Sequence, residues 1–262
     1  MNNQAELISV GNELLSGRTL NTHGQDLGAA LAAIGLQLVR DTTIPDDIPT
    51  IGSTVNEALG RTRLVFVSGG LGPTVDDITR DALAEALGQK IILDRPTVVI
   101  MTERYAARGR KTTPAAERQA LVLEGATVLP NTVGAAPGQR IERPGGKFLF
   151  VLPGPPGEFN AILNEEIVPW LKERFPDARP NLVRIVRTKG IGESDIVTIL
   201  EKGSFRPVEV ELGFYPGKGK VEIHLTAAPD KETEIIRTEQ QLRDLLEKFI
   251  DHDKKGGQHE EG

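Results

Sequence analysis

The stretch that decides the fold is Leu64-Val65-Phe66-Val67-Ser68-Gly69-Gly70-Leu71-Gly72-Pro73-Thr74-Val75-Asp76-Asp77-Ile78-Thr79. Its first four residues are apolar and predict a buried strand over 64–67. The glycines then predict a tight turn, and we expect a helix to begin near Thr74. Ligands of open α/β sheets bind outside the carboxyl ends of the strands, so this turn is a candidate ligand site. The loops after the neighbouring strands should meet it.

Strands and helices alternate before this stretch. The apolar spacing predicts strands over 6–10 and 36–39 and helices over 22–34 and 49–59. Together with the strand over 64–67, this order is typical of an α/β fold with a doubly wound, mostly parallel sheet.

The alternation continues after the stretch. We expect helices over 96–107, 114–123 and 158–173, and Pro169 should bend or stop the last of them. Two further strands, over 126–129 and 147–152, should complete the sheet.

The composition near Phe175-Pro176-Asp177-Ala178-Arg179-Pro180 is typical of a linker. Beyond it we expect a small α+β unit with strands over 182–188, 208–214 and 220–227 and helices over 191–200 and 232–249. We therefore assign 1–175 to an α/β domain that carries the site, 181–250 to a second domain, and 251–262 to a polar tail that should be disordered.

Composition excludes several classes of function. The formal net charge of the 262 residues is −6, so we expect no direct contact with nucleic acid. There is no cysteine, which removes disulfides, thiolate metal sites and cysteine nucleophiles. No segment approaches the about 18 apolar residues of a membrane span, and the amino end carries no signal pattern. We expect a cytoplasmic protein without membrane contact.

The glycine turn has the features of a phosphate site. Gly69, Gly70 and Gly72 lack a Cβ atom, so backbone N–H groups can approach an anion that the amino end of a helix would also attract. Ser68 and Thr74 flank the glycines. The turn has neither the Gly-Lys-Ser/Thr of a P-loop nor the Gly-x-Gly-x-x-Gly of a dinucleotide fingerprint, which weakens kinase and dehydrogenase interpretations.

Two acidic residues follow the glycines. Asp76 and Asp77 would repel a phosphate unless a cation lay between them, so the pattern predicts Mg²⁺ or a similar hard ion held by these carboxylates. Thr74 and Asp77 also have the spacing of a capping box, and acids in the first turn of a helix are favourable without a ligand. For Asp77 both explanations stay open, and for Asp76 we favour the ligand.

Two other loops should reach the same edge. The loops after the strands over 6–10 and 147–152 offer Asn12, Glu13, Asn21, Pro153, Gly154 and Glu158. The loop over 131–138 is either an ordinary turn or a backbone contact to a base or sugar, through Asn131 and Gly134. Lys111, Arg104 and Arg118 could face phosphates, although most such residues are simply solvated.

Five motifs together resemble the CinA family, the competence-damage-inducible proteins. They are Gly11-Asn12-Glu13-Leu14-Leu15-Ser16-Gly17 with Asn21-Thr22, Ser68 to Thr79, Asn131 to Gly138, Leu152 to Glu158, and Gly190-Ile191-Gly192-Glu193-Ser194. The element around Asp76 and Asp77 is shared with the wider molybdopterin-binding superfamily, and the others narrow the resemblance to CinA.

The resemblance implies a fold and an activity. It implies a molybdopterin-binding-like first domain, a KH-like second domain and a homodimer. It also implies a pyrophosphatase that needs Mg²⁺, Mn²⁺ or Co²⁺, with K⁺ as a further candidate, and that converts ADP-ribose to AMP and ribose 5-phosphate. Some relatives act on FAD or CoA. Many members continue into a domain that deamidates nicotinamide mononucleotide, and since this chain ends where that domain would start, we expect that activity to be absent.

Our leading hypothesis is therefore hydrolysis of an ADP-ribose-like nucleotide diphosphate. Asp76 and Asp77 would hold the ion, Glu13 or Glu158 would act as the base, and Lys111 or Arg118 would neutralise the leaving phosphate. One alternative is a molybdopterin- or nucleotide-binding module without turnover. Another is a partner protein in competence or DNA repair. The family usually has Asn where this chain has His23, which puts a contact carried over to that side chain in doubt.

Overall fold

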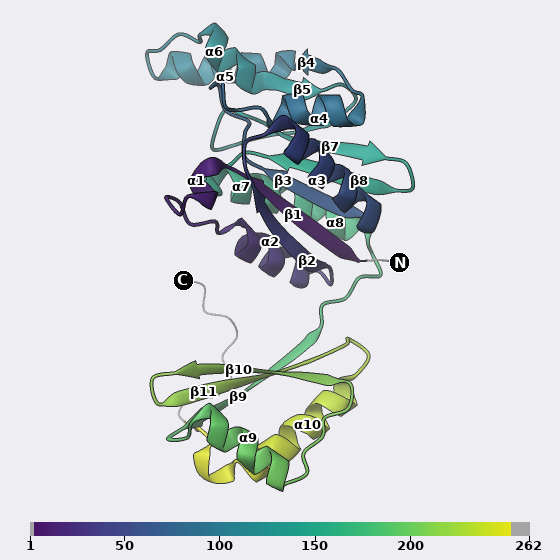
Figure 1. Cartoon of the computed structure of the whole chain (residues 1–262), viewed down its shortest axis with the longest axis vertical. Helices are drawn as coiled ribbons and strands as arrows, with labels where there is room; N and C mark the ends of the chain where they lie inside the picture. The colour runs from purple at the N-terminus through teal and green to yellow at the C-terminus, as the bar shows by residue number, and fades with distance from the viewer. Residues whose placement is uncertain (1–2, 253–262) are drawn as a thin grey trace. The chain divides into compact units, whose positions relative to one another are not determined.

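The structure is a computed structural model that describes residues 3–252 (Figure 1). The contacts divide the chain into two compact units, with the boundary between Ala178 and Arg179. Among the residues that the structure describes, no helix has the length and apolar character needed to span a membrane.

The first unit is built on a mixed sheet with the strand order β2-β1-β3-β8-β7-β6. Parallel pairing joins β1 (Gln4–Val10) to β2 (Gln37–Ile44) and to β3 (Leu64–Ser68), and β3 to β8 (Lys147–Leu152). The antiparallel strands β7 (Gly138–Arg143) and β6 (Thr127–Leu129) complete the edge. The predicted mostly parallel sheet is confirmed, whereas β7 was not predicted.

Helices cover both faces of this sheet, because its central strands are apolar on both sides (Figure 1). In β3, Leu64 and Phe66 face the core under α2 (His23–Ala32) and α7 (Pro156–Ile162). Val65 and Val67 face the opposite core, under α3 (Ile48–Arg61) and α4 (Thr79–Leu87). The sheet is therefore held rigidly from both sides, and the loops at its ends are positioned by it.

Between α4 and β6 the chain leaves the sheet and forms a small excursion. It contains β4 (Ile91–Leu93), α5 (Arg95–Ala107), α6 (Pro114–Glu117) and β5 (Leu121–Leu123). The predicted helix over 114–123 is wrong in its second half. After a 3₁₀ turn over Arg118–Ala120, residues 121–123 pair antiparallel with β4, because a partner strand 30 residues away supplies the ladder.

The predicted helix over 158–173 is interrupted, although not as Pro169 suggested. A π turn over Leu163–Ile167 joins α7 to α8 (Val168–Arg174). Pro169 lies in the first turn of α8, directly after this π turn. The helical path therefore continues past the proline.

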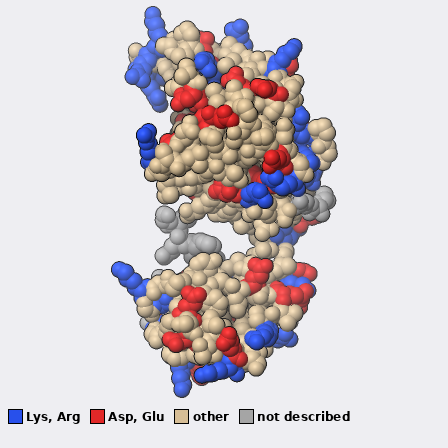
Figure 2. All heavy atoms as spheres, in the orientation of Figure 1, with Lys and Arg blue, Asp and Glu red and all other residues tan. Residues whose placement is uncertain are grey.

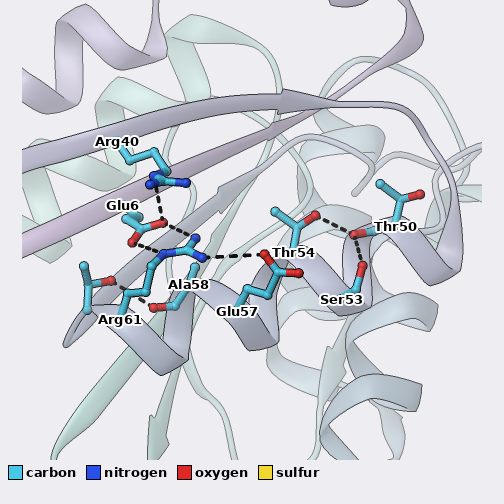
Figure 3. Close-up of polar contacts among 9 residues, drawn as sticks. Glu6, Arg40, Thr50, Ser53, Thr54, Glu57, Ala58 and Arg61 are labelled. Carbon is cyan, nitrogen blue, oxygen red and sulfur yellow. Dashed lines mark hydrogen bonds and ion pairs between the residues drawn. The ribbon is translucent and has the colours of Figure 1, made fainter.

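One buried charge lies in the amino-terminal half of β1, away from the carboxyl edge of the sheet (Figure 3). The Glu6 side chain of β1 is only 4% exposed, and both of its oxygens accept hydrogen bonds from Arg61 at the end of α3, at 3.0 and 2.8 Å. Arg40 of β2 lies 4.0 Å from the same carboxylate. This cluster neutralises a charge inside the sheet and belongs to the scaffold rather than to the site.

The second unit is a three-stranded antiparallel sheet covered by two helices. The strand order is β10 (Val210–Gly217), β11 (Lys220–Ala227), β9 (Leu182–Lys189), with α9 (Glu193–Lys202) and α10 (Glu232–Leu245) packed on it. The disordered tail was predicted to begin at residue 251, which is too early. Asp251 is 8% exposed and accepts a 2.7 Å hydrogen bond from Lys220. Residues 253–262 of that prediction lie outside the described chain.

Candidate active site

A cavity of about 480 Å³ lies where the loops after β1, β3 and β8 meet. β2 and β3 lie on opposite sides of β1, so the cavity is at the switch point where open α/β sheets bind ligands. Three predicted loops therefore do meet. The predicted residues that line the cavity are Glu13, Gly69, Gly70, Gly72, Asp76, Asp77, Pro153, Gly154 and Glu158.

Gly69 is the residue that lets these loops approach one another. Its φ is +102°, and a Cβ at this position would lie 2.2 Å from the carbonyl oxygen of Val10 at the end of β1. Its N–H donates to the carbonyl of Leu152 at the end of β8, at 3.0 Å. Only glycine tolerates both the φ angle and the contact, so the turn after β3 is fixed against both neighbouring strands.

The segment after the glycines is a braced loop rather than a helix. The Asp77 carboxylate accepts hydrogen bonds from the N–H groups of Gly72 and Thr74, both at 2.8 Å. α4 begins only at Thr79, so the helix predicted near Thr74 is wrong. The Asp77 side chain satisfies amides that a helix would have left pointing to a ligand, and it acts as a brace of the loop.

Asp76 is the more accessible of the two acids. Its side chain is exposed at the cavity and accepts a hydrogen bond from the Thr74 hydroxyl. This hydrogen bond, and a weaker one from the backbone, hold the pKa of the Asp76 carboxyl below its usual value. Asp76 is therefore an anion at neutral pH and is available to a cation.

Sequence analysis did not identify Arg80, which lies under the glycine loop. Its side chain is buried and donates to the carbonyls of Leu71 and Gly72, at 2.9 and 3.1 Å. Burial lowers the pKa of Arg80, and the charges of Asp77 and Asp81 oppose that effect. The available signal was a basic residue in the first turn of a helix, where acidic residues are normally preferred.

The loops after β1 and β2 place a second pair of acids, Glu13 and Asp46, at the cavity. Glu13 lies in the single-turn helix α1 (Asn12–Leu15) and lines the cavity. The Asn12 backbone N–H donates to Asp46 at 2.8 Å, so Asn12 contributes its amide to the loop. Asp46 also lines the cavity and was not predicted, because it follows β2 in a segment whose Pro-Asp-Asp pattern is typical of a turn.

Asn131 connects the fourth predicted loop to Glu158. Its side chain is almost fully buried, and Nδ2 donates to Glu158 Oε2 at 2.6 Å and to the Ala136 carbonyl at 2.8 Å. Its Oδ1 accepts from the N–H groups of Val133 and Gly134. A Cβ at Gly134 would lie 2.0 Å from the Glu158 carboxylate, so glycine is needed for this contact.

The remaining predicted residues lie outside the cavity lining. Asn21 donates to Ser9 at 2.9 Å, and Ser68 is buried 2.7 Å from Nδ1 of His23. The His23 ring stacks on the ring of Phe159, with 4.2 Å between the ring centroids. His23 and Ser68 therefore lie beneath the site.

The three basic residues predicted to face phosphates, Lys111, Arg104 and Arg118, are also absent from the lining. Lys111 and Arg118 are exposed on the excursion between α5 and β5. Within the described chain, the cavity is lined by five carboxylates and by no Lys, Arg or His: Glu13, Asp46, Asp76, Asp77 and Glu158. The positive charge that a bound phosphate requires must therefore come from groups other than the side chains that line the cavity.

The donor set fits a divalent ion that is shared with a ligand. Among the described residues, no three His, Cys, Asp or Glu side chains converge closely enough to hold a metal by themselves. Mg²⁺ typically binds through one or two carboxylates and completes its shell with water and substrate phosphates. Asp76, an exposed carboxylate at the cavity, can supply one such ligand.

Comparisons with known proteins agree with this architecture. The family model described as "Probable molybdopterin binding domain" matches residues 6–173, and that described as "Damage-inducible protein CinA KH domain" matches 183–252. The predicted fold class, with its KH-like second part, is confirmed.

Individual relatives are similar over nearly the whole chain. A CinA-like protein of Gemmatimonas aurantiaca is 36% identical over 94% of this chain and 59% of its own length. A Streptococcus suis protein named for competence damage is 36% identical over 96% of this chain and 62% of its own length. The chain thus spans about three fifths of these relatives.

A solved structure is similar to a large part of the chain. It is the protein CinA of Thermoplasma acidophilum, described as having unknown function, with a TM-score of 0.58 and 36% identity over 63% of this chain and 98% of that one. The chain therefore belongs to the CinA family and joins a domain of the molybdopterin-binding type to a CinA KH domain.

Proposed function

We propose that the acidic cavity hydrolyses the pyrophosphate bond of ADP-ribose or a related nucleotide diphosphate, with a divalent metal ion. The observation that carries the proposal is the lining of the cavity. Among the described residues, the lining contains five carboxylates beside a glycine turn and no basic side chain. A diphosphate cannot approach such a surface without cations. A cavity of this size falls in the range of small-molecule sites, about 300–1,000 Å³.

Backbone amides are the donors that would hold the diphosphate. The N–H groups of Gly69 and Gly72 are already used by Leu152 and Asp77. In the described chain, the N–H groups of Gly70 and Gly154 have no protein acceptor, and both residues line the cavity. They are therefore the candidate phosphate donors. Arg80 adds positive charge beneath the same loop without entering the cavity.

The metal, when bound, would neutralise phosphate charge and polarise the attacking water. We assign its protein ligand to Asp76, with Asp77 occupied mainly as the brace of the loop. Mg²⁺, Mn²⁺ and Co²⁺ are the candidate ions, and K⁺ is a further candidate.

Glu158 is the preferred base. One of its oxygens accepts the 2.6 Å hydrogen bond from Asn131, which fixes the position of the carboxylate at the cavity that Glu158 lines. The water would give its proton to this carboxylate and bond to phosphorus, and the bond to the bridging oxygen would break. The products are AMP and ribose 5-phosphate. Glu13 also lines the cavity but accepts no hydrogen bond from a described residue through its carboxylate.

The test is incubation of the protein with ADP-ribose and each of the three divalent ions, with AMP measured by chromatography. Wild type should release AMP, and Asp76→Asn should reduce the rate at least tenfold. Asp81→Asn is the matched control, because Asp81 is an exposed carboxylate five residues away that does not line the cavity. Equal rates for Asp76→Asn and wild type would overturn the proposal.

A second candidate is a molybdopterin- or nucleotide-binding module without turnover. The match to a molybdopterin-binding family model favours it. It predicts saturable binding in a calorimetric titration with no AMP formed in the assay. A role as a partner protein in competence or DNA repair rests on the relatives' names alone. The homodimer and the cytoplasmic location remain predictions.

A further inference from the structure

A second cavity, which we call the arginine cavity, lies under the carboxyl end of α5. Its volume is about 130 Å³, and three arginines line it: Arg104, Arg108 and Arg110. No carboxylate is among its lining residues. None of the three forms an ion pair with a described residue, whereas Arg61 and Arg184 each pair with a glutamate. The cavity therefore carries positive charge that the described protein does not neutralise.

The chain builds this cluster by ending α5 in a tight reversal. Gly109 has a φ of +66° and its N–H donates to the Ala106 carbonyl, while the Arg110 N–H donates to the Tyr105 carbonyl at 2.9 Å. This is the Schellman pattern with glycine at its left-handed position. It returns Arg110 to the side of the helix that carries Arg104. Figure 2 shows Lys and Arg side chains projecting around the end of the first unit where Figure 1 places α5 and α6.

The size of the arginine cavity limits its occupant. Sites for whole small molecules have volumes of about 300–1,000 Å³, so about 130 Å³ suits a single group rather than a nucleotide. A phosphate monoester dianion matches guanidinium groups in charge and in the spacing of its oxygens. The Tyr105 side chain also lines the cavity and can donate a hydrogen bond.

One loop separates the arginine cavity from the acidic cavity. Gly134 and Ala135 line the first, and Ala136 lines the second. Arg104 Nη1 donates to the carbonyls of Asn131 and Gly134, at 2.9 and 2.6 Å.

The same two loop residues reach the acid of the other cavity. Asn131 donates to Glu158, and a Cβ at Gly134 would lie 2.0 Å from the Glu158 carboxylate. The loop is therefore in contact with Arg104 on one side and with Glu158 on the other. A change in the position of Arg104 would therefore alter its hydrogen bonds to both loop carbonyls, those of Asn131 and Gly134.

We propose that the arginine cavity binds a phosphate group, and that its occupant acts on Glu158 through Arg104 and the loop over 131–138. The phosphate would compete with the two loop carbonyls for the guanidinium of Arg104, because a phosphate carries a full negative charge and can bind a guanidinium through two oxygens, whereas a carbonyl is neutral. Binding should then loosen the loop and lower kcat. The binding site stands independently of the proposed function, whereas the effect on kcat rests on it.

The binding test is a calorimetric titration of the full chain with inorganic phosphate. Wild type should bind one phosphate, and Arg108→Ala combined with Arg110→Ala should weaken binding at least tenfold. The matched control combines Arg95→Ala with Arg237→Ala, which removes the same charge from exposed positions outside the cavity. Equal titrations for all three proteins, or no binding by wild type, would overturn the site.

The kinetic test uses the same variants with ADP-ribose as substrate. Phosphate should lower kcat of wild type and of the control and leave the Arg108/Arg110 variant unaffected. Arg104→Ala should lower kcat more than it raises KM, and Arg104→Lys should restore part of the loss. A phosphate effect that persists without Arg108 and Arg110 would contradict the coupling. The phosphate in the arginine cavity could be free phosphate or a phosphate group of the substrate, and a titration with CoA, which carries a 3′-phosphate, distinguishes the two. If CoA binds more tightly than inorganic phosphate and its binding depends on Arg108 and Arg110, the cavity binds a group on the substrate. If CoA binding does not depend on these arginines, the cavity binds free phosphate.

Discussion

Asn131 Nδ2 lies 2.6 Å from Oε2 of Glu158, and this hydrogen bond joins the loop after β6 to the first turn of α7. Nearly full burial of Asn131 and its four hydrogen bonds fix the amide, so the amide in turn fixes the carboxylate. The two residues are 27 positions apart in sequence and meet because β6, β7 and β8 are neighbours in the sheet. A carboxylate held in this way can orient a water molecule. For that role the carboxylate needs a defined position more than it needs to be a strong base.

Replacement of Asn131 should therefore reduce catalysis by releasing Glu158. We expect Glu158→Gln to lower kcat by about 10²–10⁴, the usual contribution of a general base, and Asn131→Ala to lower it less. Steady-state kinetics with ADP-ribose measure both effects. Thr132→Ala is the matched control, because its hydroxyl bonds to Glu165 rather than to Glu158. A normal kcat in Glu158→Gln would remove Glu158 from the chemistry.

Asp76 and Asp77 should separate in their effects on activity and stability. Asp77→Ala leaves the N–H groups of Gly72 and Thr74 without their acceptor, so the free energy of unfolding should fall by about 1–3 kcal/mol. Asp76→Asn should leave stability almost unchanged and raise the Mg²⁺ concentration needed for half-maximal activity. Thermal unfolding and a metal titration measure the two. If Asp76→Asn unfolds like Asp77→Ala, then Asp76 is a structural residue.

Gly69 should not tolerate a side chain. Gly69→Ala forces a non-glycine residue to φ +102°, which costs about 1–3 kcal/mol, and adds the clash with the Val10 carbonyl. Gly60→Ala in α3 meets no atom within 4 Å and should stabilise the protein by about 0.5–1 kcal/mol. Denaturant unfolding of both variants checks the signs. A Gly69→Ala variant as stable as wild type would show that the turn can move away from β1.

His23 should make stability depend on pH. Burial lowers the pKa of the His23 ring, against the opposing effects of Asp26 and the Gly154 backbone. A histidine in an unfolded chain titrates near about 6.5, so below that pH the unfolded state binds a proton that the folded state resists.

The stability that neutral His23 contributes should therefore be complete above pH of about 6.5 and decline as the pH falls below it. His23→Gln cannot titrate, and the difference in unfolding free energy between wild type and this variant should change across that window. A difference that is constant from pH 7.5 to 5 would mean that His23 is protonated equally in both states.

The parts of the fold predicted from sequence are those encoded locally. The apolar run over 64–67 and the glycines that end it specify β3 and its turn without reference to the rest of the chain. β5 was missed because its hydrogen-bond partner, β4, lies about 30 residues away in sequence. β7 pairs with β8 across a short turn, but it was missed because Ile141 is the one large apolar residue in its Gly-Gln-Arg-Ile-Glu-Arg sequence, so no apolar pattern marks it as a strand. The helix expected near Thr74 failed because Asp77 satisfies the loop amides by itself.

The candidate site shows the same division. Glu13, Asp76 and Glu158 could be predicted because each follows a strand that ends at one edge of the sheet. Asp46 and Arg80 were not, since an acid in a turn and a basic residue in a helix are common without any function. Which of the predicted residues touch one another depends on the packing of the loops, and spacing in sequence does not contain that information.

The most direct test of the central claim, that the acidic cavity hydrolyses a pyrophosphate bond, is ³¹P NMR of ADP-ribose incubated in ¹⁸O-labelled water with the protein and Mg²⁺, Mn²⁺ or Co²⁺. We predict equal amounts of AMP and ribose 5-phosphate, one ¹⁸O atom in the phosphate of one product, and loss of the reaction in Asp76→Asn but not in Asp81→Asn. Unchanged ADP-ribose with all three ions, or an Asp76→Asn variant as active as wild type, would contradict the claim.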